Sequence, residues 1–205
     1  MRRCCAAVAA LLLAACSNPS PSSEAAFHLW LEEDAPRAAA FRRFELLLER
    51  EGVLNVVPAH ELWRTDQLRR ECVTAPFTPP PEDAWGNIVP VLRFVRDQVK
   101  HSIGDVRVVS AYRDENFNRC VRGAPLSAHR GFYALDLVPA DRAVSRERLI
   151  QTLCPIHARA GAEARIGLGI YTGQRFHLDA RGFRGWGADF RRATFPCDER
   201  AVGSG

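Results

Sequence analysis

The sequence lacks an apolar run long enough to span a membrane. Its longest run of Ala, Val and Leu covers residues 6–15, whereas a membrane-spanning helix needs about 20 apolar residues. The run follows the basic start Met1-Arg2-Arg3, and a short apolar stretch after a basic start is typical of a secretory signal peptide. We therefore predict that residues 1–15 are a signal peptide and take no part in the fold.

The cysteines beyond residue 16 include no closely spaced pair. Cys72, Cys120, Cys154 and Cys197 lie far apart in the chain, while structural zinc sites usually draw on Cys-x-x-Cys pairs. This spacing argues against a structural zinc cluster. An even number of cysteines in an exported chain instead predicts two disulfides, and three pairings are open.

A strong net charge is also missing. The formal net charge is +4 and part of it comes from the leader, so we expect no nucleic-acid partner. A mild basic excess would suit an anionic polymer, although a solvated surface rich in arginine explains it as well. The chain has no internal repeat, and without the leader its length fits one domain.

Helical and strand patterns follow one another along the chain. Helix signals include the caps Asp114 and Ser145 and the stop at Gly52, and short β-branched runs indicate strands. The predicted helices cover residues 35–51, 87–99, 114–122 and 145–160, and the predicted strands cover residues 106–111, 132–138, 166–171 and 175–181. We expect an α+β fold with a small antiparallel sheet flanked by helices, in which Thr172-Gly173 turns the last hairpin.

Proline marks a boundary in the first half of the chain. Residues 77–81 include three consecutive prolines, which neither continue a helix nor fit a central strand. We predict a flexible tether rich in Ser and Pro at residues 16–26, a helical N-terminal extension at residues 27–81 and the main domain at residues 82–205.

Three polar residues in the second half have the ligand chemistry of a catalytic zinc site. Such a site typically takes three protein ligands from His and carboxylate and keeps a fourth position for water. His129, Asp136 and His177 supply this set. Asp136 is expected on a strand face with Ala134 and Phe132, and His177 alternates with apolar neighbours, so both side chains can leave the sheet toward one site. The remaining histidines lack such company and are expected to be structural: His28, His60, His101 and His157.

The order of these residues carries a family pattern. Residues 127–136 read Ser-Ala-His-Arg-Gly-Phe-Tyr-Ala-Leu-Asp, and His177 follows about forty residues later. Upstream, residues 110–113 read Ser-Ala-Tyr-Arg and are followed by Asn118. Over residues 88–186 the chain thus resembles the zinc D-alanyl-D-alanine carboxypeptidases and related murein endopeptidases, whose fold is shared with the Hedgehog signalling domain.

The resemblance implies a zinc peptidase that hydrolyses a bond in the peptidoglycan stem peptide or crossbridge, with Zn²⁺ on the three ligands above. It assigns Arg113 to the developing oxyanion or the substrate carboxylate. A salt bridge to Asp114 or Glu115 is the structural alternative for Arg113. The kind of bond, D,D or L,D, and the choice between carboxypeptidase and endopeptidase stay open.

The pattern lacks its usual base. Many family members carry Glu or Asp three residues before the last ligand, and this chain has Gln174 there. An amide orients a water but does not accept its proton. Asp179, two residues past His177, is one candidate for the base, and orienting a ligand or anchoring the hairpin is its structural alternative. A non-catalytic, zinc-containing peptidoglycan-binding protein and a structural lipoprotein without metal are the competing hypotheses.

The end of the leader resembles the lipobox of bacterial lipoproteins. Leu13-Ala14-Ala15-Cys16 matches that pattern, in which the cysteine is diacylated, and Ser17 favours the outer membrane by the same resemblance. We expect an exported monomer anchored by lipid on Cys16, at the periplasmic face of the outer membrane in a Gram-negative cell. An ordinary secretory signal is the alternative.

Overall fold

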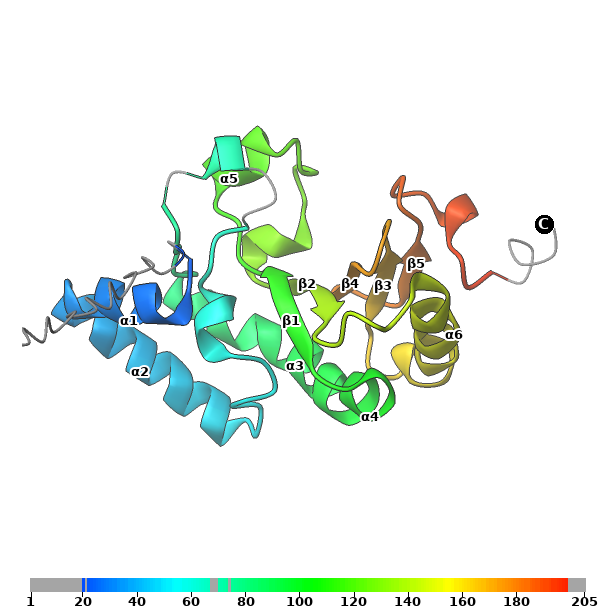
Figure 1. The fold of residues 1–205 in the computed structure, drawn as a ribbon, viewed down its shortest axis with the longest axis horizontal. Coiled ribbons are helices and arrows are strands. Elements are labelled where there is room, and N and C mark those ends of the chain that lie inside the picture. Colours follow the sequence, from blue (N-terminus) through cyan, green and yellow to red (C-terminus); the bar gives the residue numbers. More distant parts are fainter. Residues whose placement is uncertain (1–19, 21, 67–69, 74, 199–205) are drawn as a thin grey trace, which may run out of the picture.

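The computed structural model describes residues 20, 22–66, 70–73 and 75–198. The predicted signal peptide, the lipobox and residues 16–19 and 21 of the predicted tether lie outside these residues. Within them, helices surround one five-stranded sheet, which confirms the predicted α+β fold. Figure 1 shows α1 and α2 at one end of the molecule and α6 at the other, with the sheet between them.

The described chain opens with α1 (Glu24–Glu32) and α2 (Ala35–Arg50). The side chains of Ser23 and Asp34 cap these helices by accepting backbone hydrogen bonds. α2 confirms the helix predicted at residues 35–51. α1 corrects the tether prediction for residues 24–26, which are helical because the Ser23 cap starts the helix and Phe27 is wholly buried in the core. No helix in the described part of the chain combines the length and apolar character needed to cross a membrane.

An aromatic cluster joins these helices to the rest of the molecule. Ring centroids lie 4.8 Å apart for Phe27 and Phe41, 5.7 Å for Phe44 and Trp63, and 5.4 Å for Phe44 and Trp85. All five rings are buried in one hydrophobic cluster that continues into the sheet. The core therefore crosses the boundary placed at residue 81, even though residues 78–81 have no regular secondary structure, as the prolines predict.

A helical stretch leads to the sheet through η3 (Glu82–Ile88), α3 (Val89–Phe94), the π-helical turn η4 (Val95–Val99) and α4 (Lys100–Ile103). Pro90 lies in the first turn of α3, where its missing N–H has no helical partner to lose. Gly104 ends the stretch with a φ of 76°. The helix predicted at residues 87–99 is confirmed and continues at both ends.

The sheet consists of β1 (Val106–Ser110), β2 (Ala134–Pro139), β3 (Gly167–Ile170), β4 (Phe176–Asp179) and β5 (Arg184–Trp186). Its strand order is β1-β2-β4-β3-β5. Neighbouring strands are antiparallel except β3 and β5, which run parallel. The four predicted strands are thus present, and β5 was missed because a three-residue strand has too few positions to show an alternating pattern.

One strand begins later than predicted. Phe132 takes the left-handed conformation with a φ of 58°, and its N–H donates to the His129 carbonyl, which ends the 3₁₀ turn η5 (Ala128–Gly131). The ring of Phe132 is wholly buried beside Phe44, and this burial offsets an uncommon backbone geometry. Phe132 therefore precedes β2 and shares no strand face with Asp136.

The other helical segments are α5 (Glu115–Cys120), α6 (Arg146–Ile156), the π-helical turn η6 (His157–Gly161) and the 3₁₀ turns η1 (Ala59–Leu62), η2 (Arg70–Cys72) and η7 (Arg192–Thr194). Asp114 and Ser145 cap α5 and α6 as predicted. Pro155 lies inside α6, and the chain changes to π-helical geometry directly after that helix. In the β3–β4 hairpin, Tyr171 N–H donates to the Arg175 carbonyl and Gly173 has a φ of 64°, so the connection is longer than the predicted two-residue turn.

Both predicted disulfides form. Cys72 bonds to Cys120, which ties η2 to α5, and Cys154 bonds to Cys197, which ties α6 to the segment after η7. The bridges close loops of 48 and 43 residues, and loop-closure entropy assigns each about 4 kcal/mol of stability. Disulfides of this kind are typical of proteins outside the reducing cytoplasm, so they indicate an exported protein.

The N-terminal segment, here residues 22–66, covers the edge of the sheet that β1 forms. Glu61, which is wholly buried, accepts the Val108 N–H of β1 at 2.8 Å and the Arg107 Nε–H at 2.6 Å. Arg64 donates to the carbonyl of the same Val108. These two side chains satisfy backbone groups on the strand edge that would otherwise be open to another strand.

Loss of Glu61 should destabilise the whole fold. Glu61→Ala leaves the Val108 N–H and two guanidinium groups without their buried carboxylate, so we expect the free energy of unfolding to fall by about 3–5 kcal/mol. Urea unfolding followed by circular dichroism measures this change. Glu49→Gln on the exposed face of α2 is the matched control, and equal stability of the two variants would contradict the edge role of Glu61.

Candidate metal centre

The three predicted ligands come together. His129 lies on η5, and Asp136 and His177 face one another directly across β2 and β4. One ligand atom from each residue lies within 4.8 Å of the others, and all three side chains are buried. The structure thus confirms that this cluster has the arrangement of a metal site.

Each imidazole is fixed by its second nitrogen. The Nδ1–H of His129 donates to the Ala111 carbonyl at 2.6 Å, and the Nε2–H of His177 donates to Asp179 Oδ2 at 3.1 Å. This leaves His129 Nε2 at 3.4 Å from Asp136 Oδ2 and His177 Nδ1 at 2.9 Å from Asp136 Oδ1. Histidines that bind metals are commonly oriented in this way, by a carbonyl or carboxylate on the nitrogen that faces away from the ion.

The donor set fits a small divalent ion. Two imidazole nitrogens and one carboxylate oxygen form the ligand set of catalytic zinc sites, and ligands at about 2.0–2.2 Å from a tetrahedral ion lie roughly 3.4 Å from one another. The separation from His129 Nε2 to Asp136 Oδ2 is 3.4 Å, that from His177 Nδ1 to Asp136 Oδ1 is 2.9 Å, and one ligand atom from each of the three residues lies within 4.8 Å of the others. His129, Asp136 and His177 could therefore hold a metal ion.

A glycine makes room for the aromatic wall of the centre. Gly169 of β3 lies opposite His177 on one side and Trp186 on the other. A Cβ atom at Gly169 would come within 2.5 Å of the Trp186 Nε1 atom. Because Gly169 has no Cβ atom, the Trp186 indole packs against His177 with the two ring centroids 5.1 Å apart, and it helps to keep that imidazole in place.

Burial and charge shift the pKa values of the two histidines in opposite directions. Burial, with the nearby Arg113 guanidinium, lowers the pKa of His129 to about 4, so this imidazole is neutral at pH 7. Burial also opposes charge on His177, but hydrogen bonds to Asp136 and Asp179 outweigh it and raise the pKa of His177. Burial would raise the pKa of Asp136, yet the two imidazoles hold it well below its ordinary value.

Arg113 reaches the centre as predicted. Its Nη2 atom donates to Asp136 Oδ2 at 2.8 Å and to Asp66 Oδ2 at 3.3 Å, and its Nε atom donates to Ser110 Oγ at 2.8 Å. The alternative of a salt bridge to its chain neighbours does not form, since Asp114 caps α5. The guanidinium therefore lies beside the metal ligands.

Two charged residues at the centre were missed. Arg175 donates to Asp136 Oδ2, and its Nη2 atom lies 3.7 Å from Asp66 Oδ2. Its Nε atom is buried with no hydrogen-bond acceptor among the described residues, an arrangement that costs about 1–3 kcal/mol. Asp66 is buried and lies far from the ligands in the sequence, so no local pattern could connect it to them.

Of the other two predicted site residues, Gln174 lies away from the ligands and Asp179 lies beside one of them. The Gln174 amide donates to the carbonyls of Arg142, at 3.0 Å, and Val144, so it fastens the hairpin to the loop after β2 and does not contact the ligands. This corrects its predicted place at the centre. Asp179 holds the far side of His177 and pairs with Arg184 at 2.7 Å, an arrangement that fits its alternative role of orienting a ligand.

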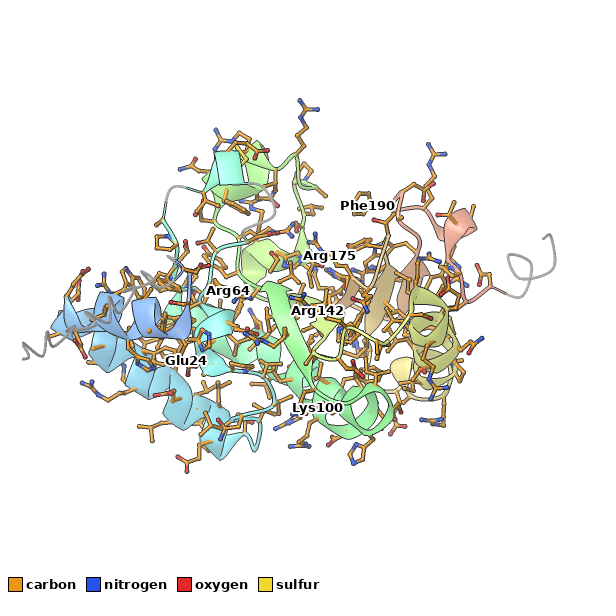
Figure 2. The ribbon with its side chains drawn as sticks, in the orientation of Figure 1. Glu24, Arg64, Lys100, Arg142, Arg175 and Phe190 are labelled. Carbon is orange, nitrogen blue, oxygen red and sulfur yellow. A yellow bond between two sulfur atoms is a disulfide. The ribbon has the colours of Figure 1, made fainter. Side chains whose placement is uncertain are left out.

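A cleft opens onto the centre. It has a volume of about 260 Å³ and is lined by Arg113, Asp136, Tyr171, Thr172, Arg175, Ala188 and Phe190. Figure 2 shows Arg175 and Phe190 on the same side of the strands. Tyr171 is largely buried there, and burial, with the charge of Asp136, raises its pKa, so its hydroxyl stays protonated. Solvent and small ligands thus reach Asp136 past two cations and an aromatic rim.

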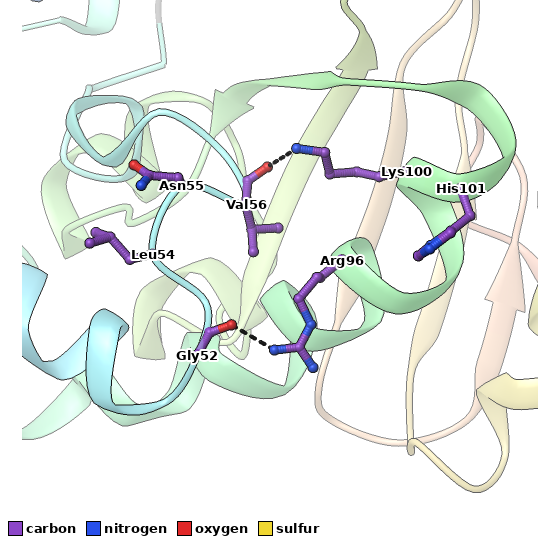
Figure 3. A pocket seen from close by; sticks show the side chains of 7 residues that line it. All are labelled: Gly52, Leu54, Asn55, Val56, Arg96, Lys100 and His101. Carbon is purple, nitrogen blue, oxygen red and sulfur yellow. Dashed lines mark hydrogen bonds between the residues drawn. The ribbon is translucent and has the colours of Figure 1, made fainter.

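A second hollow, of about 360 Å³, lies between the loop after α2 and the helical stretch η4–α4. Figure 3 shows Arg96 and Lys100 in it, donating to the carbonyls of Gly52 and Val56. Both cations also pair with neighbouring carboxylates, those of Asp97 and Asp105. Because its charges are already paired and it holds none of the three ligands, this hollow is not the candidate site.

The chain gives no match when it is compared with protein-family models, with curated proteins or with solved structures. The functional assignment therefore depends on the chemistry of the centre.

Metal binding should release a proton from His177. A metal ion binds His177 only when Nδ1 carries no proton. Because the pKa of His177 is raised, protons compete for this nitrogen as the pH falls toward that pKa, so the affinity for zinc should weaken with decreasing pH. We expect the number of protons released per zinc ion to approach one as the pH falls well below the pKa of His177. Zinc titration calorimetry in buffers of different ionisation enthalpy measures this number, and a value of zero between about pH 5.5 and 7 would contradict the arrangement.

Asp179→Asn provides the matched test of the orienting carboxylate. The amide keeps the shape but lacks the charge that stabilises the His177 ring, so zinc affinity should fall by about 10-fold and proton release should decrease. Glu163→Gln, at an exposed position, should leave both quantities unchanged.

Proposed function

We propose that this chain is a zinc-dependent peptidase that hydrolyses peptide bonds of peptidoglycan. The observation that carries the proposal is a buried pair of histidines and an aspartate at the base of a cleft that also holds two guanidinium groups. Disulfides indicate an exported protein, and the peptides of the cell wall are substrates available outside the cytoplasm.

Zinc is the proposed ion because of the ligand chemistry. Two neutral imidazoles and a carboxylate suit zinc better than calcium or magnesium, which prefer oxygen ligands throughout. A zinc ion in such a site lowers the pKa of its water toward neutrality and polarises a carbonyl group. His129, Asp136 and His177 would hold it, with the Ala111 carbonyl and Asp179 orienting the imidazoles.

The residues of the cleft supply orientation and charge. The Arg113 guanidinium, kept in position by Ser110 and Asp66, can donate to an oxyanion or carboxylate that enters the cleft. Gln174 does not contribute, because its amide is bound to the loop after β2. Asp179 does not act as a base in this scheme, because His177, Arg184 and the Arg181 N–H occupy its oxygens.

The position of Gln174 favours a second candidate function. A chain without a carboxylate at that position can keep the metal and bind wall peptides without cutting them. The proposed location is the same for both functions: export, with a lipid on Cys16 that holds the protein at the periplasmic face of the outer membrane.

Digestion of purified sacculi separates the two functions. The zinc-loaded protein should release new peptide fragments, identified by mass spectrometry, and His129→Ala should lower their rate of formation by about 100-fold or more, since a lost ligand costs more than a lost outer contact. His101→Ala, an exposed histidine remote from the ligands, is the control and should cleave normally. Absence of fragments with zinc-loaded wild type would rule out the peptidase and favour binding alone.

A further inference from the structure

Two guanidinium groups converge on a single oxygen at the base of the cleft. Arg113 comes from the segment after β1 and Arg175 from the β3–β4 hairpin, yet both donate to Asp136 Oδ2. Their side chains are 12% and 25% exposed, so Arg175 is the more accessible from the cleft. The site already described uses Arg113, and it leaves Arg175 without an assigned role.

The charges of this cluster balance only before a metal ion enters. Asp66 and Asp136 carry two negative charges, and Arg113 and Arg175 carry two positive charges. A divalent ion on the two imidazoles and Asp136 brings two positive charges to the base of a small cleft and displaces at most one proton, so at least one positive charge is added. Such a surplus favours an anionic ligand, because buried charge is costly unless it is paired.

The hydrogen-bonding capacity of Arg175 points to the same kind of ligand. Its Nε–H is buried and has no acceptor among the described residues, although a guanidinium pairs best with an anion that accepts two parallel bonds. A metal ion bound to the Asp136 carboxylate would withdraw electron density from Oδ2, the oxygen that both arginines share. This oxygen would then be a weaker hydrogen-bond acceptor. A planar carboxylate can replace it and accept from both guanidinium groups.

The rest of the cleft limits the size of the ligand. Its rim is apolar, with Phe190 74% exposed and its ring centroid 5.7 Å from that of Tyr171. Its volume of about 260 Å³ lies below the roughly 300–1,000 Å³ of pockets that hold drug-sized molecules. The terminal residue of a peptide, with a small apolar side chain, fits within these limits.

We infer that Arg175, with Arg113, binds the free carboxylate of a peptide's last residue, so that this chain removes terminal residues. The inference rests on the proposed function. In the reaction, the oxygen of water bonds to the carbonyl carbon before the last residue, the C–N bond breaks, and the leaving nitrogen takes a proton. Arg175 is a specificity-determining residue in this scheme, since it contacts the carboxylate and not the bond that breaks.

Binding of a small carboxylate tests the inference without turnover. The probes are N-acetyl-D-alanine and its neutral analogue N-acetyl-D-alaninamide, titrated calorimetrically into the zinc-loaded protein. The wild-type protein should bind the acid at least about 10-fold more tightly than the amide. Arg175→Gln should weaken binding of the acid by about 10-fold and leave binding of the amide unchanged. Arg191→Gln removes the same charge from a side chain that is 79% exposed and should behave as wild type.

A second variant guards against misfolding. Arg175→Lys keeps the charge but lacks the planar fork of the guanidinium group, so it should weaken binding of N-acetyl-D-alanine by about 3-fold. Thermal unfolding checks that each variant is folded. Equal binding of acid and amide by wild type would overturn the inference, as would equal losses in Arg175→Gln and Arg191→Gln.

The sacculus digest separates this inference from the proposed function. If the acid binds in an Arg175-dependent way but sacculi are not cleaved, the carboxylate site is supported and the peptidase function is refuted. Release of crosslink fragments, with no difference between acid and amide, would refute the carboxylate site and leave the peptidase standing.

Discussion

The Asp136 carboxylate is the group on which the organisation of the centre depends. It is buried in the middle of the sheet, where two imidazoles and two guanidinium groups approach its two oxygens. A buried carboxylate needs such partners, because its desolvation is costly. The cross-strand register that places Asp136 opposite His177 also sets Ser110 and Gly169 beside them, so one pairing of strands fixes both the ligands and their supports.

The N-terminal segment is part of the same structure and not an appendage. Glu61 and Arg64 cover the edge of β1, the strand that leads to the Arg113 segment. Two residues beyond Arg64, Asp66 pairs with both arginines of the cleft. The disulfide from Cys72 to Cys120 ties η2 to α5. The residues from Glu61 to Asp66 therefore contribute both to the stability of the β1 edge and to the charges of the cleft. The hydrophobic core likewise runs across residue 81.

The sequence predicted the features that leave a local signal. Periodic helices, β-branched strands, capping residues and the order of the three ligands were all recognisable. Asp66 and Arg175 were not, because they meet only through the fold and neither stands in a pattern with the ligands. Phe132 was expected in a strand, and the burial of its ring fixes a left-handed backbone instead. The direction of the Gln174 amide depends on carbonyls some thirty residues away, and the disulfide pairing depends on the same long-range packing.

The proposed function depends on zinc binding by His129, Asp136 and His177. X-ray absorption at the zinc edge, measured on the purified protein together with its zinc content, is the decisive measurement of this binding. We expect close to one zinc per chain, bound by two imidazoles and oxygen with no sulfur neighbour, and loss of this signal in Asp136→Ala. Sulfur in the zinc environment, or an unchanged signal in Asp136→Ala, would show that these three residues are not the zinc ligands.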